Sequence, residues 1–512
     1  MTSLVTSLVA LFTLSLAISW ISIRIGIPLS HYFDITDRPE GHKAHDTITP
    51  FIGGVGIFFA IIVGLSIIDG SHLLSSIPFE CLMASIITIF LTGFADDIWH
   101  LNYKIRLLAQ TAIAVAMAIW GGVILLDLGS MFSGQVFVLG LVSLPFTVFA
   151  TIGVINALNM IDGLDGLAGS LSFVSFLMVA VVTFVAGEEA YLGLVVTLLG
   201  GLSGFLYYNL RHGNRRRAAV FLGDNGSMLL GLLFSWLLIH LSQGNDRAMT
   251  PVTALWIVAV PLMDAVGVMI RRIYYRNSPF YPDRNHLHHL LIRAGFRTQD
   301  IVYLMASIQF LFGMIGLAGL YLKIPEAWML VSFIGIFTIY CYIIARPWRF
   351  VPALRSFHTK LGLISADCIG VFVGCFPVQE ATSFIHALVE ELRSLNYPYD
   401  VRIYEYQDAG NDRLAYAVIE LFLEKDDVSS ANQIQPLIAR LRKRQDVYGK
   451  LRIRQFIGRD QQNDRRIGNK PMIAESRTQD RRSKRNTLLL YRARHDGALA
   501  TLQYPLTRPM FR

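Results

Sequence analysis

The sequence predicts an all-α polytopic membrane protein of about eleven transmembrane helices, followed by a smaller α+β domain at its C-terminus. Of its 512 residues, 53% are hydrophobic and 16% are charged, whereas average soluble domains carry about 25% charged residues. The charges are sparse before Arg346 and dense after it. The chain therefore divides into a membrane body and a polar, cytoplasmic body.

Eleven stretches approach the roughly 20 mostly apolar residues that a helix needs to cross a bilayer. The first begins at Leu4 with no basic segment before it, so we interpret it as a retained span and not as a cleaved signal peptide. The expected spans cover residues 4–24, 51–69, 79–95, 105–126, 135–155, 166–186, 190–210, 225–241, 252–270, 301–321 and 328–345.

The connections between these spans alternate between two sides of the membrane, and their basic residues are unequally shared. One side takes the loops at 28–50, 96–104, 156–165, 211–224 and 271–300, which hold thirteen Lys and Arg residues. The other side holds two, Arg247 and Lys323. Because basic loops stay in the cytoplasm, we expect the first side to be cytoplasmic, with the N-terminus outside and the C-terminus inside. These loops also account for the net charge of +8, so nucleic acid is not expected as a partner.

Four cysteines, Cys81, Cys341, Cys368 and Cys375, show no C-x-x-C spacing and predict neither a disulfide framework nor a metal knuckle.

The polar part has its own periodicity. After the membrane domain (1–346) and a basic linker (347–364), the residue pattern predicts strands at 369–375, 399–406, 413–423 and 450–457, of which the second and third alternate. Helical spacing at 380–395 and 429–444 completes a β-α-β-β-α-β order, which is typical of a ferredoxin-like domain over 365–458. Residues 459–512 are polar and basic, and we expect a disordered tail.

Acidic pairs and clusters mark the cytoplasmic side. Asp96 and Asp97 end the third span, and adjacent carboxylates both ionise readily only near a cation. They predict either a Mg²⁺ or proton-transfer site or an acidic cap paired with Lys104. Asn156, Asn159, Asp162 and Asp165 follow an i, i+3 spacing, which aligns side chains on a helix. Four such residues exceed what a helix cap needs, so this group favours function.

The eighth span opens on Phe221-Leu-Gly-Asp224. A normal N-cap would explain it, but the basic run at 215–217 favours a carboxylate beside a metal-bridged phosphate. His286, His288 and His289 form an H-x-H-H run that fits no zinc motif.

With Arg284 nearby, that run favours phosphate binding. Lys43 and His45 lie in a loop that is either another cationic site or an ordinary basic loop. Asp264, about 10 Å inside the ninth span, either lines the cavity or pairs with a neighbouring helix.

Together these clusters supply carboxylates for a hard cation and cationic groups for phosphates. Mg²⁺ is bound by a few carboxylates and substrate phosphates, so the sequence favours phosphoryl transfer between a soluble donor and a lipid. A lipid or solute transporter is the alternative, but it would place polar groups near the midplane or on both sides.

The motifs resemble the polyprenyl-phosphate N-acetylhexosamine-1-phosphate transferases, glycosyltransferase family 4. The resemblance rests on Asp96-Asp97, the 156–166 run, Phe221-Leu-Gly-Asp224 and Asp283-x-x-His-x-His-His289. The run at 278–296 is similar to the branch that uses UDP-N-acetylglucosamine (UDP-GlcNAc) and undecaprenyl phosphate. The likeness covers about the first 346 residues and leaves the cytoplasmic part without an assigned partner.

The resemblance implies a bacterial inner-membrane enzyme whose active site faces the cytoplasm. It would transfer N-acetylglucosamine 1-phosphate to undecaprenyl phosphate, release UMP and begin O-antigen or related glycan synthesis. Another UDP-HexNAc donor and a homodimer are left open.

The resemblance also implies residue roles. Asp96, Asp97, Asp224 and His286 would be catalytic, with Asp97 as candidate base. Asp224, together with Asp96 and Asp97, would hold Mg²⁺, for which Mn²⁺ could substitute. Substrate binding would fall to Lys43, His45, Asn156, Asn159, Asp162, Asp165, Arg284, His288 and His289.

Overall fold

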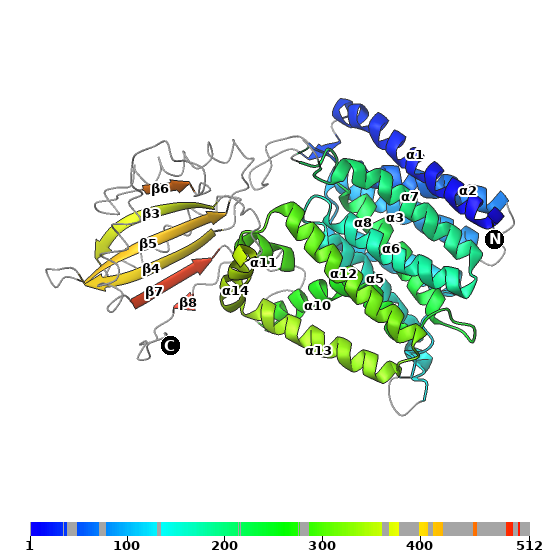
Figure 1. The fold of residues 1–512 in the computed structure, drawn as a ribbon. Coiled ribbons are helices and arrows are strands. Elements are labelled where there is room, and N and C mark those ends of the chain that lie inside the picture. The colour runs from blue at the N-terminus through cyan, green and yellow to red at the C-terminus, as the bar shows by residue number, and fades with distance from the viewer. Residues whose placement is uncertain are drawn as a thin grey trace.

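The computed structural model of the chain is mostly helical, with one separate sheet near the C-terminus (Figure 1). It describes residues 2–33, 35–37, 49–70, 78–130, 135–212, 215, 217–274, 276, 286–360, 368–377, 399–407, 413–422, 454–457, 488–494 and 500–501.

The helices, in chain order, are α1 (Thr2–Tyr32), α2 (Gly53–Gly70), α3 (Phe79–Trp99), α4 (Tyr103–Ile119), the short 3₁₀ helix η2 (Gly140–Val142), α5 (Ser143–Ile161), α6 (Leu167–Ala186), α7 (Glu189–Asn209), α8 (Gly223–Ser242), α9 (Pro251–Ile257), α10 (Ala259–Tyr274), α11 (Leu287–Ala294), α12 (Thr298–Tyr321), α13 (Glu326–Ala345) and α14 (Pro347–Lys360). A two-stranded sheet, β1 (Thr36–Asp37) and β2 (Thr49–Pro50), lies between α1 and α2 in the sequence.

The length and composition of these helices fit a polytopic membrane protein. Within the described ranges, eight helices are long and apolar enough to cross a bilayer, and the bent pair α9–α10 makes nine if it counts as one span. α2 and α4 are shorter and occupy the predicted spans at 51–69 and 105–126. The predicted count of eleven therefore stays a prediction, although a helix or helix pair stands at every expected position.

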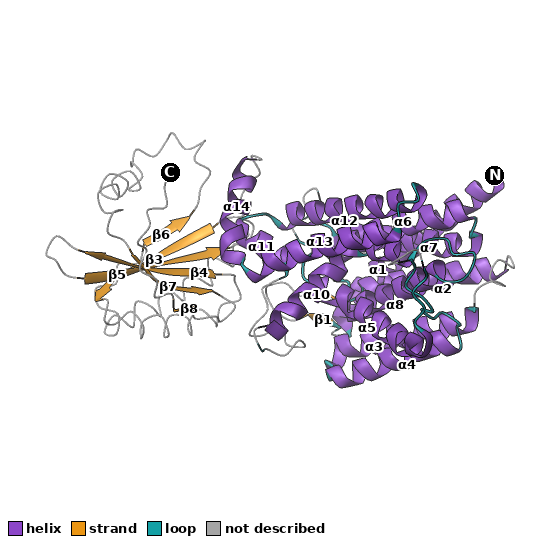
Figure 2. Ribbon diagram, turned by 90° about the horizontal axis from the view of Figure 1, so that it is seen from below, coloured by secondary structure: helices purple, strands orange, loops and turns teal. Residues whose placement is uncertain are grey.

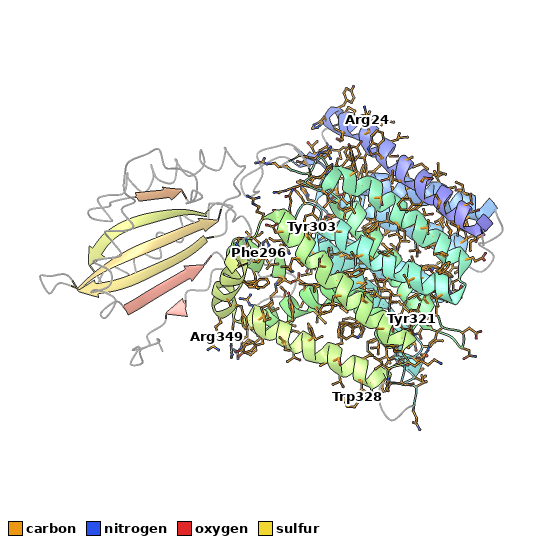
Figure 3. All side chains as sticks on the ribbon, in the orientation of Figure 1. Arg24, Phe296, Tyr303, Tyr321, Trp328 and Arg349 are labelled. Atoms are coloured by element: carbon orange, nitrogen blue, oxygen red, sulfur yellow. The ribbon has the colours of Figure 1, made fainter. Side chains whose placement is uncertain are left out.

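The outer surface of the bundle is apolar. Large side chains such as Leu141, Phe149 and Ile339 are more than half exposed, as lipid-facing residues are. Figure 3 shows Tyr321 and Trp328 at one end of α12 and α13, and Arg24 and Tyr303 at the opposite end of the bundle. Aromatic rings concentrate at membrane interfaces, which fits a membrane-spanning bundle, and the predicted orientation stays a prediction.

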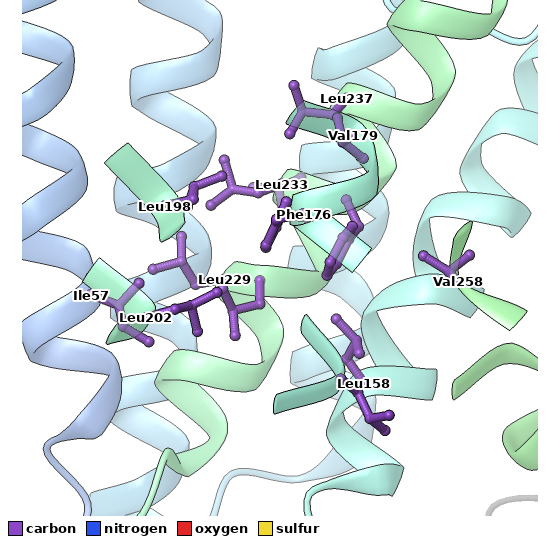
Figure 4. Close-up of a cluster of buried hydrophobic side chains, with 14 of the residues drawn as sticks. Ile57, Leu158, Phe176, Val179, Leu198, Leu202, Leu229, Leu233, Leu237 and Val258 are labelled. Carbon is purple, nitrogen blue, oxygen red and sulfur yellow. The ribbon is translucent and has the colours of Figure 1, made fainter. Parts of the chain in front are cut away.

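Helix α8 forms the centre of the bundle. Nearly all of its residues are buried, and it packs against α2, α3 and α5. Leu229, Leu233 and Leu237 of α8 lie among side chains of α2, α5, α6 and α7 (Figure 4). The rings of Phe176 and Phe234 stack with centroids 3.8 Å apart. Because neighbouring helices enclose α8, the surrounding bundle fixes the position of its polar N-terminus.

The ninth predicted span is broken by a bend of 86° between α9 and α10. A bend frees backbone groups that water cannot reach in a membrane, so another group must pair with them. Gln309 of α12, fully buried, accepts from the Val260 N–H at 2.9 Å and donates to the Ile257 carbonyl at 2.7 Å. One amide thus stabilises both sides of the bend.

The polar part contains a six-stranded sheet beside α11 and α14, which lie between it and the bundle (Figures 1 and 2). Its strands are β3 (Cys368–Pro377), β4 (Tyr399–Gln407), β5 (Arg413–Phe422), β6 (Arg454–Ile457), β7 (Leu488–Arg494) and β8 (Ala500–Thr501). They run antiparallel in the order β6-β3-β5-β4-β7-β8.

The first four strands stand where the sequence predicts them. The connections from β3 to β4 and from β5 to β6 each pass over one strand, which is the split arrangement of the ferredoxin-like pattern. The two predicted helices, 380–395 and 429–444, lie outside the described residues, so the ferredoxin-like domain stays a prediction.

Two segments differ from expectation. The basic linker contains helix α14, which packs on α11, and the tail expected to be disordered contributes β7 and β8. Pro347 explains the first difference, because proline favours the first turn of a helix. The second arises because the short apolar run that opens β7, Leu488–Leu490, lies in a tail whose overall composition is basic.

We expect Gln309→Leu to destabilise the protein, because it leaves the Val260 N–H and the Ile257 carbonyl unpaired. Each buried unpaired group costs about 1–3 kcal/mol. Thermal unfolding in detergent should show a midpoint lower by several degrees. Thr338→Val, which removes an exposed side-chain hydrogen bond on α13, is the control and should leave the midpoint unchanged. An unchanged midpoint for Gln309→Leu would contradict this role.

Candidate active site

Four helices bring polar groups together around Asp224, in the first turn of α8. Arg106 of α4 donates through one nitrogen, Nη1, to Asp96 Oδ2 at 2.6 Å and to Asp224 Oδ2 at 3.4 Å. Asn159 of α5 donates to the other oxygen of Asp224 and to Ser227 Oγ at 3.0 Å. Asp96 of α3, Arg106, Asn159 and Asp224 therefore form one cluster, of which Asp224 and Arg106 are about one-third exposed.

Asp97 has a different surrounding from its neighbour. Its Oδ1 accepts the Asp224 N–H at 2.8 Å, and its Oδ2 accepts the Asn225 N–H at 3.0 Å and the Asn225 side-chain amide. The first amide groups of a helix have no partner within the helix, and a carboxylate there also benefits from the helix dipole. Asp97 thus caps α8 from another helix, and the predicted roles of base and metal ligand stay predictions.

Asn225 fastens the same helix start to α2. Its amide donates to the Phe51 carbonyl at 3.1 Å, and the Gly53 N–H donates to the Phe221 carbonyl at 2.9 Å. A Cβ added at Gly54 would lie 1.9 Å from Asn225 Oδ1. The absence of a side chain at Gly54 therefore permits the close approach that holds Asp224 in place.

The Asn156–Asp165 motif does not act as one unit. The loop expected at 156–165 is helical as far as Ile161. Asn159 joins the Asp224 cluster, whereas Asn156 donates to Gln110 Oε1 of α4 at 2.8 Å. Asn156 thus pairs between helices away from the cluster.

Asp165 holds the basic loop before α8. Its Oδ2 accepts from Arg211 Nε at 2.8 Å and from the Ala218 N–H at 3.1 Å. Both bonds hold the segment that leads to the start of α8. Asp165, which was predicted to bind substrate, therefore has a supporting contact in the structure.

Asp162 ends α5 and lies near the other acids. Burial, followed by the charges of Asp97 and Asp165, raises the pKa of Asp162 to about 7. Near neutral pH it is therefore divided between a neutral hydrogen-bond donor and a charged acceptor. Such a group can pair with the mixed donors and acceptors of a nucleobase.

The three histidines start helix α11. His286 is 5% exposed, and its Nδ1 lies 2.7 Å from Asp264 Oδ2 of α10. His288 is 1% exposed, and its ring is nearly parallel to that of His286, with centroids 5.6 Å apart. Burial and the neighbouring charge of His289 hold the pKa of His288 well below its ordinary value, so His288 is neutral at pH 7. Asp264, which could have lined the cavity or paired with a neighbour, pairs with His286.

α11 and the acidic loop after α5 are in contact. A Cβ added at Gly163 would lie 2.8 Å from His288 Nε2, so the ring of His288 packs directly against the loop between Asp162 and Asp165. The histidine run and the 156–165 motif therefore border one region.

Three predicted residues, Lys43, His45 and Arg284, lie outside the described residues. Arg106 and Ser227 join the cluster although neither was among the predicted site residues. The sequence could have indicated Arg106, because it follows Asp96 by ten positions and Asp97 by nine. Lys104 was instead the expected ion-pair partner of these acids. In the structure the ion-pair partner of Asp96 is Arg106.

The cluster fits a divalent cation in one specific way. Among the described residues, no group of three or more His, Cys, Asp or Glu side chains is arranged to enclose a metal ion. Mg²⁺ does not require such a cage, because it commonly uses one or two carboxylates with waters and substrate phosphates. Asp224, with its side chain 32% exposed, and the 5% exposed Asp96 are the acids that match this pattern.

Comparison with known proteins identifies related sequences. The profile of glycosyl transferase family 4 matches residues 79–242, which include Asp96, Asp97, Arg106, Asn159 and Asp224.

Three relatives are undecaprenyl-phosphate alpha-N-acetylglucosaminyl 1-phosphate transferases. The protein of Yersinia pestis is 34% identical over 358 residues, which are 70% of this chain and 95% of the relative. That of Escherichia coli strain K12 is 32% identical over 328 residues, or 64% and 88%. That of Haemophilus influenzae is 33% identical over 342 residues, or 67% and 95%.

We expect Asp97→Ala to lower thermal stability as well as activity, because it leaves the Asp224 and Asn225 amides without their acceptor. Loss of a helix cap costs about 0.5–2 kcal/mol. The matched control is Glu188→Ala, at a helix-cap position whose side chain makes no capping bond, and it should unfold like the wild type. A wild-type unfolding midpoint for Asp97→Ala would refute the capping role.

Asp162 should make stability depend on pH. Its pKa is 3.8 in an unfolded chain and about 7 in the fold, so the folded state binds the proton more tightly. The free energy of unfolding therefore has its full contribution from Asp162 at low pH. This contribution is lost as the pH rises from about 4 to about 7, because the unfolded chain then releases the proton more readily than the folded one. Thermal midpoints measured between pH 5 and pH 8 should fall more for the wild type than for Asp162→Asn. Parallel curves would contradict the raised pKa.

Proposed function

The chain belongs to glycosyl transferase family 4, the polyprenyl-phosphate N-acetylhexosamine-1-phosphate transferases, and on this basis we propose that it transfers N-acetylglucosamine 1-phosphate from UDP-GlcNAc to undecaprenyl phosphate. It is a membrane-embedded enzyme of phosphoglycosyl transfer. The observation that supports the proposal best is the convergence of α3, α4 and α5 on Asp224 of α8, with α4 and α5 bonded to its carboxylate and α3 to its backbone N–H. Because the family consists of enzymes, the transporter alternative is set aside.

The proposed reaction exchanges one phosphoryl bond. A phosphate oxygen of undecaprenyl phosphate attacks the β-phosphorus of UDP-GlcNAc, the bond from that phosphorus to the α–β bridging oxygen breaks, and UMP leaves with the electron pair. The second pKa of a phosphate monoester is near 6, so at neutral pH the attacking lipid phosphate is mostly a dianion. The reaction therefore needs positioning and charge neutralisation more than a base.

The described residues supply that positioning. Asn159 and Arg106 each bond to a different oxygen of Asp224, so its carboxylate is fixed in plane. Arg106 is about one-third exposed and can extend toward a phosphate oxygen while Asp96 holds its other side. A fixed donor or cation acts on the transition state without reorganising.

Asp224 and Asp96 would hold Mg²⁺, or Mn²⁺ in its place. When bound, this cation neutralises charge on the diphosphate and on departing UMP. Asp97, by capping α8, keeps the Asp224 backbone in the position from which its side chain reaches the donor.

The donor's uridine and phosphates would lie beside the contact between the loop at Asp162 and helix α11. Asp162 can recognise the base in either protonation state. Neutral His288 and the adjacent His286 and His289 offer ring nitrogens to phosphate or sugar oxygens. Lys43, His45 and Arg284 remain proposed for the same substrates.

The product, GlcNAc-diphospho-undecaprenol, would be the first lipid intermediate of O-antigen or a related surface glycan. We place the active site at the cytoplasmic face of a bacterial inner membrane, because the basic connections and the acid clusters share one side. Another UDP-HexNAc is the alternative donor.

The test uses purified full-length protein with undecaprenyl phosphate, Mg²⁺ and a panel of UDP-sugars, with UMP release measured by chromatography. UDP-GlcNAc should give the highest kcat/KM, and omission of divalent cation should stop release. Asp224→Ala should lower kcat at least 100-fold, whereas the control Asp246→Ala, in a connection at the opposite membrane face, should behave as the wild type. Normal turnover by Asp224→Ala would refute its assignment, and no release from any donor would refute the function.

A further inference from the structure

We infer that Asp264 and Tyr340 are positioning residues for His286, so that the last helix of the membrane body, α13, contributes to the active site. This inference rests on the proposed function, in which His286 contacts the donor.

Asp264 receives three hydrogen bonds within the bundle. Its Oδ2 lies 2.7 Å from His286 Nδ1, and its Oδ1 accepts from the Leu287 N–H at 2.8 Å and from the Tyr340 hydroxyl. Asp264 is 2% exposed. A buried carboxylate is tolerated only when its oxygens are paired, and here every partner belongs to α11 or α13.

These bonds set the orientation and the protonated nitrogen of His286. An ionised carboxylate only accepts, so Nδ1 is the donor and Nε2 is the nitrogen left for a substrate. The Leu287 N–H belongs to the first residue of α11, so one carboxylate fixes both the ring and the backbone that carries it. Carboxylates that orient a histidine in this way tune its function in metal and catalytic sites.

Tyr340 of α13 completes the arrangement with its hydroxyl on Asp264 Oδ1. Its ring packs against Gly267, one turn after Asp264 on α10, and a Cβ added at Gly267 would lie 2.9 Å from Tyr340 Cε1. The small residue leaves room for the ring, and the hydroxyl then reaches the carboxylate. Asp264 of α10 thus contacts both α11 and α13.

A purely structural reading is weaker than the positioning role. Replacing a buried polar pair by well-packed apolar residues is often neutral or stabilising, so a stable contact between α10 and α13 does not need an acid. An acid inside a membrane helix is a functional feature by default. The functional group that this acid supports is the neighbouring imidazole of His286.

The experiment compares full-length Asp264→Asn, Tyr340→Phe and His286→Gln in the UMP-release assay. Asparagine keeps the size of the side chain but can donate to Nδ1, which reverses the histidine tautomer. We expect Asp264→Asn to lower kcat about 10–100-fold, the range seen for such supporting partners, with KM for undecaprenyl phosphate unchanged. Tyr340→Phe should lower kcat severalfold. Asp127→Asn, which weakens an ion pair with Arg247 away from the cluster, is the matched control and should keep wild-type kcat.

The decisive measurement is the double variant. If Asp264 acts through His286, Asp264→Asn should have no further effect on kcat in the His286→Gln background. Multiplying effects, or a wild-type kcat for Asp264→Asn, would overturn the inference. Should Asp264→Asn fail to fold, Tyr340→Phe gives the same test alone and in the His286→Gln background. If the wild type releases no UMP, the proposed transferase function fails. If the wild type is active but the variants do not behave as expected, only the positioning role of Asp264 fails.

Discussion

The bond between the Asp97 carboxylate and the first amides of α8 is the constraint on which the site depends. Neighbouring helices enclose α8 on all sides, which limits where its N-terminus can lie. Asp97 of α3 then fixes that N-terminus through two hydrogen bonds. Asn225 ties the same point to α2. Asp224 follows one residue after the start of the helix, and Asn159 and Arg106 then hold its carboxylate. The first turn of α8 is thus held by side chains of three other helices, α3, α4 and α5.

Much of this arrangement was open to prediction because it depends on local properties. Apolar length placed the spans, and the uneven distribution of Lys and Arg assigned their sides. Contacts between helices depend on rotation about each axis, which the sequence does not reveal. Asn156 and Asn159 illustrate this point: three residues turn a helix by about 300°, so their side chains point about 60° apart, one toward α4 and the other toward α8. For the same reason Arg106, and not Lys104, pairs with Asp96.

The polar part shows a second limit. Short apolar or alternating runs predicted the first four strands, and alternation itself marked the segments at 399–406 and 413–423, because period two is a strong local signal. The segment Leu488–Arg494 pairs with β4 although it lies in a basic, low-hydrophobicity region, and composition averaged over that region concealed it. Helix α14 was concealed in the same way, because its basic residues dominate a stretch whose Val351 and Leu354 pack against the core.

The bond from Tyr340 to Asp264 joins residues 76 positions apart, and this separation has a consequence for biosynthesis. A chain that is made and inserted from its N-terminus acquires the acids of α3 and α8 early, and Asp264 well before its phenol partner. Every acid around Asp224 is then present in the membrane while His286 still lacks part of its support. If Tyr340 supports His286 as inferred, the site therefore reaches its final geometry only after α13 has been made.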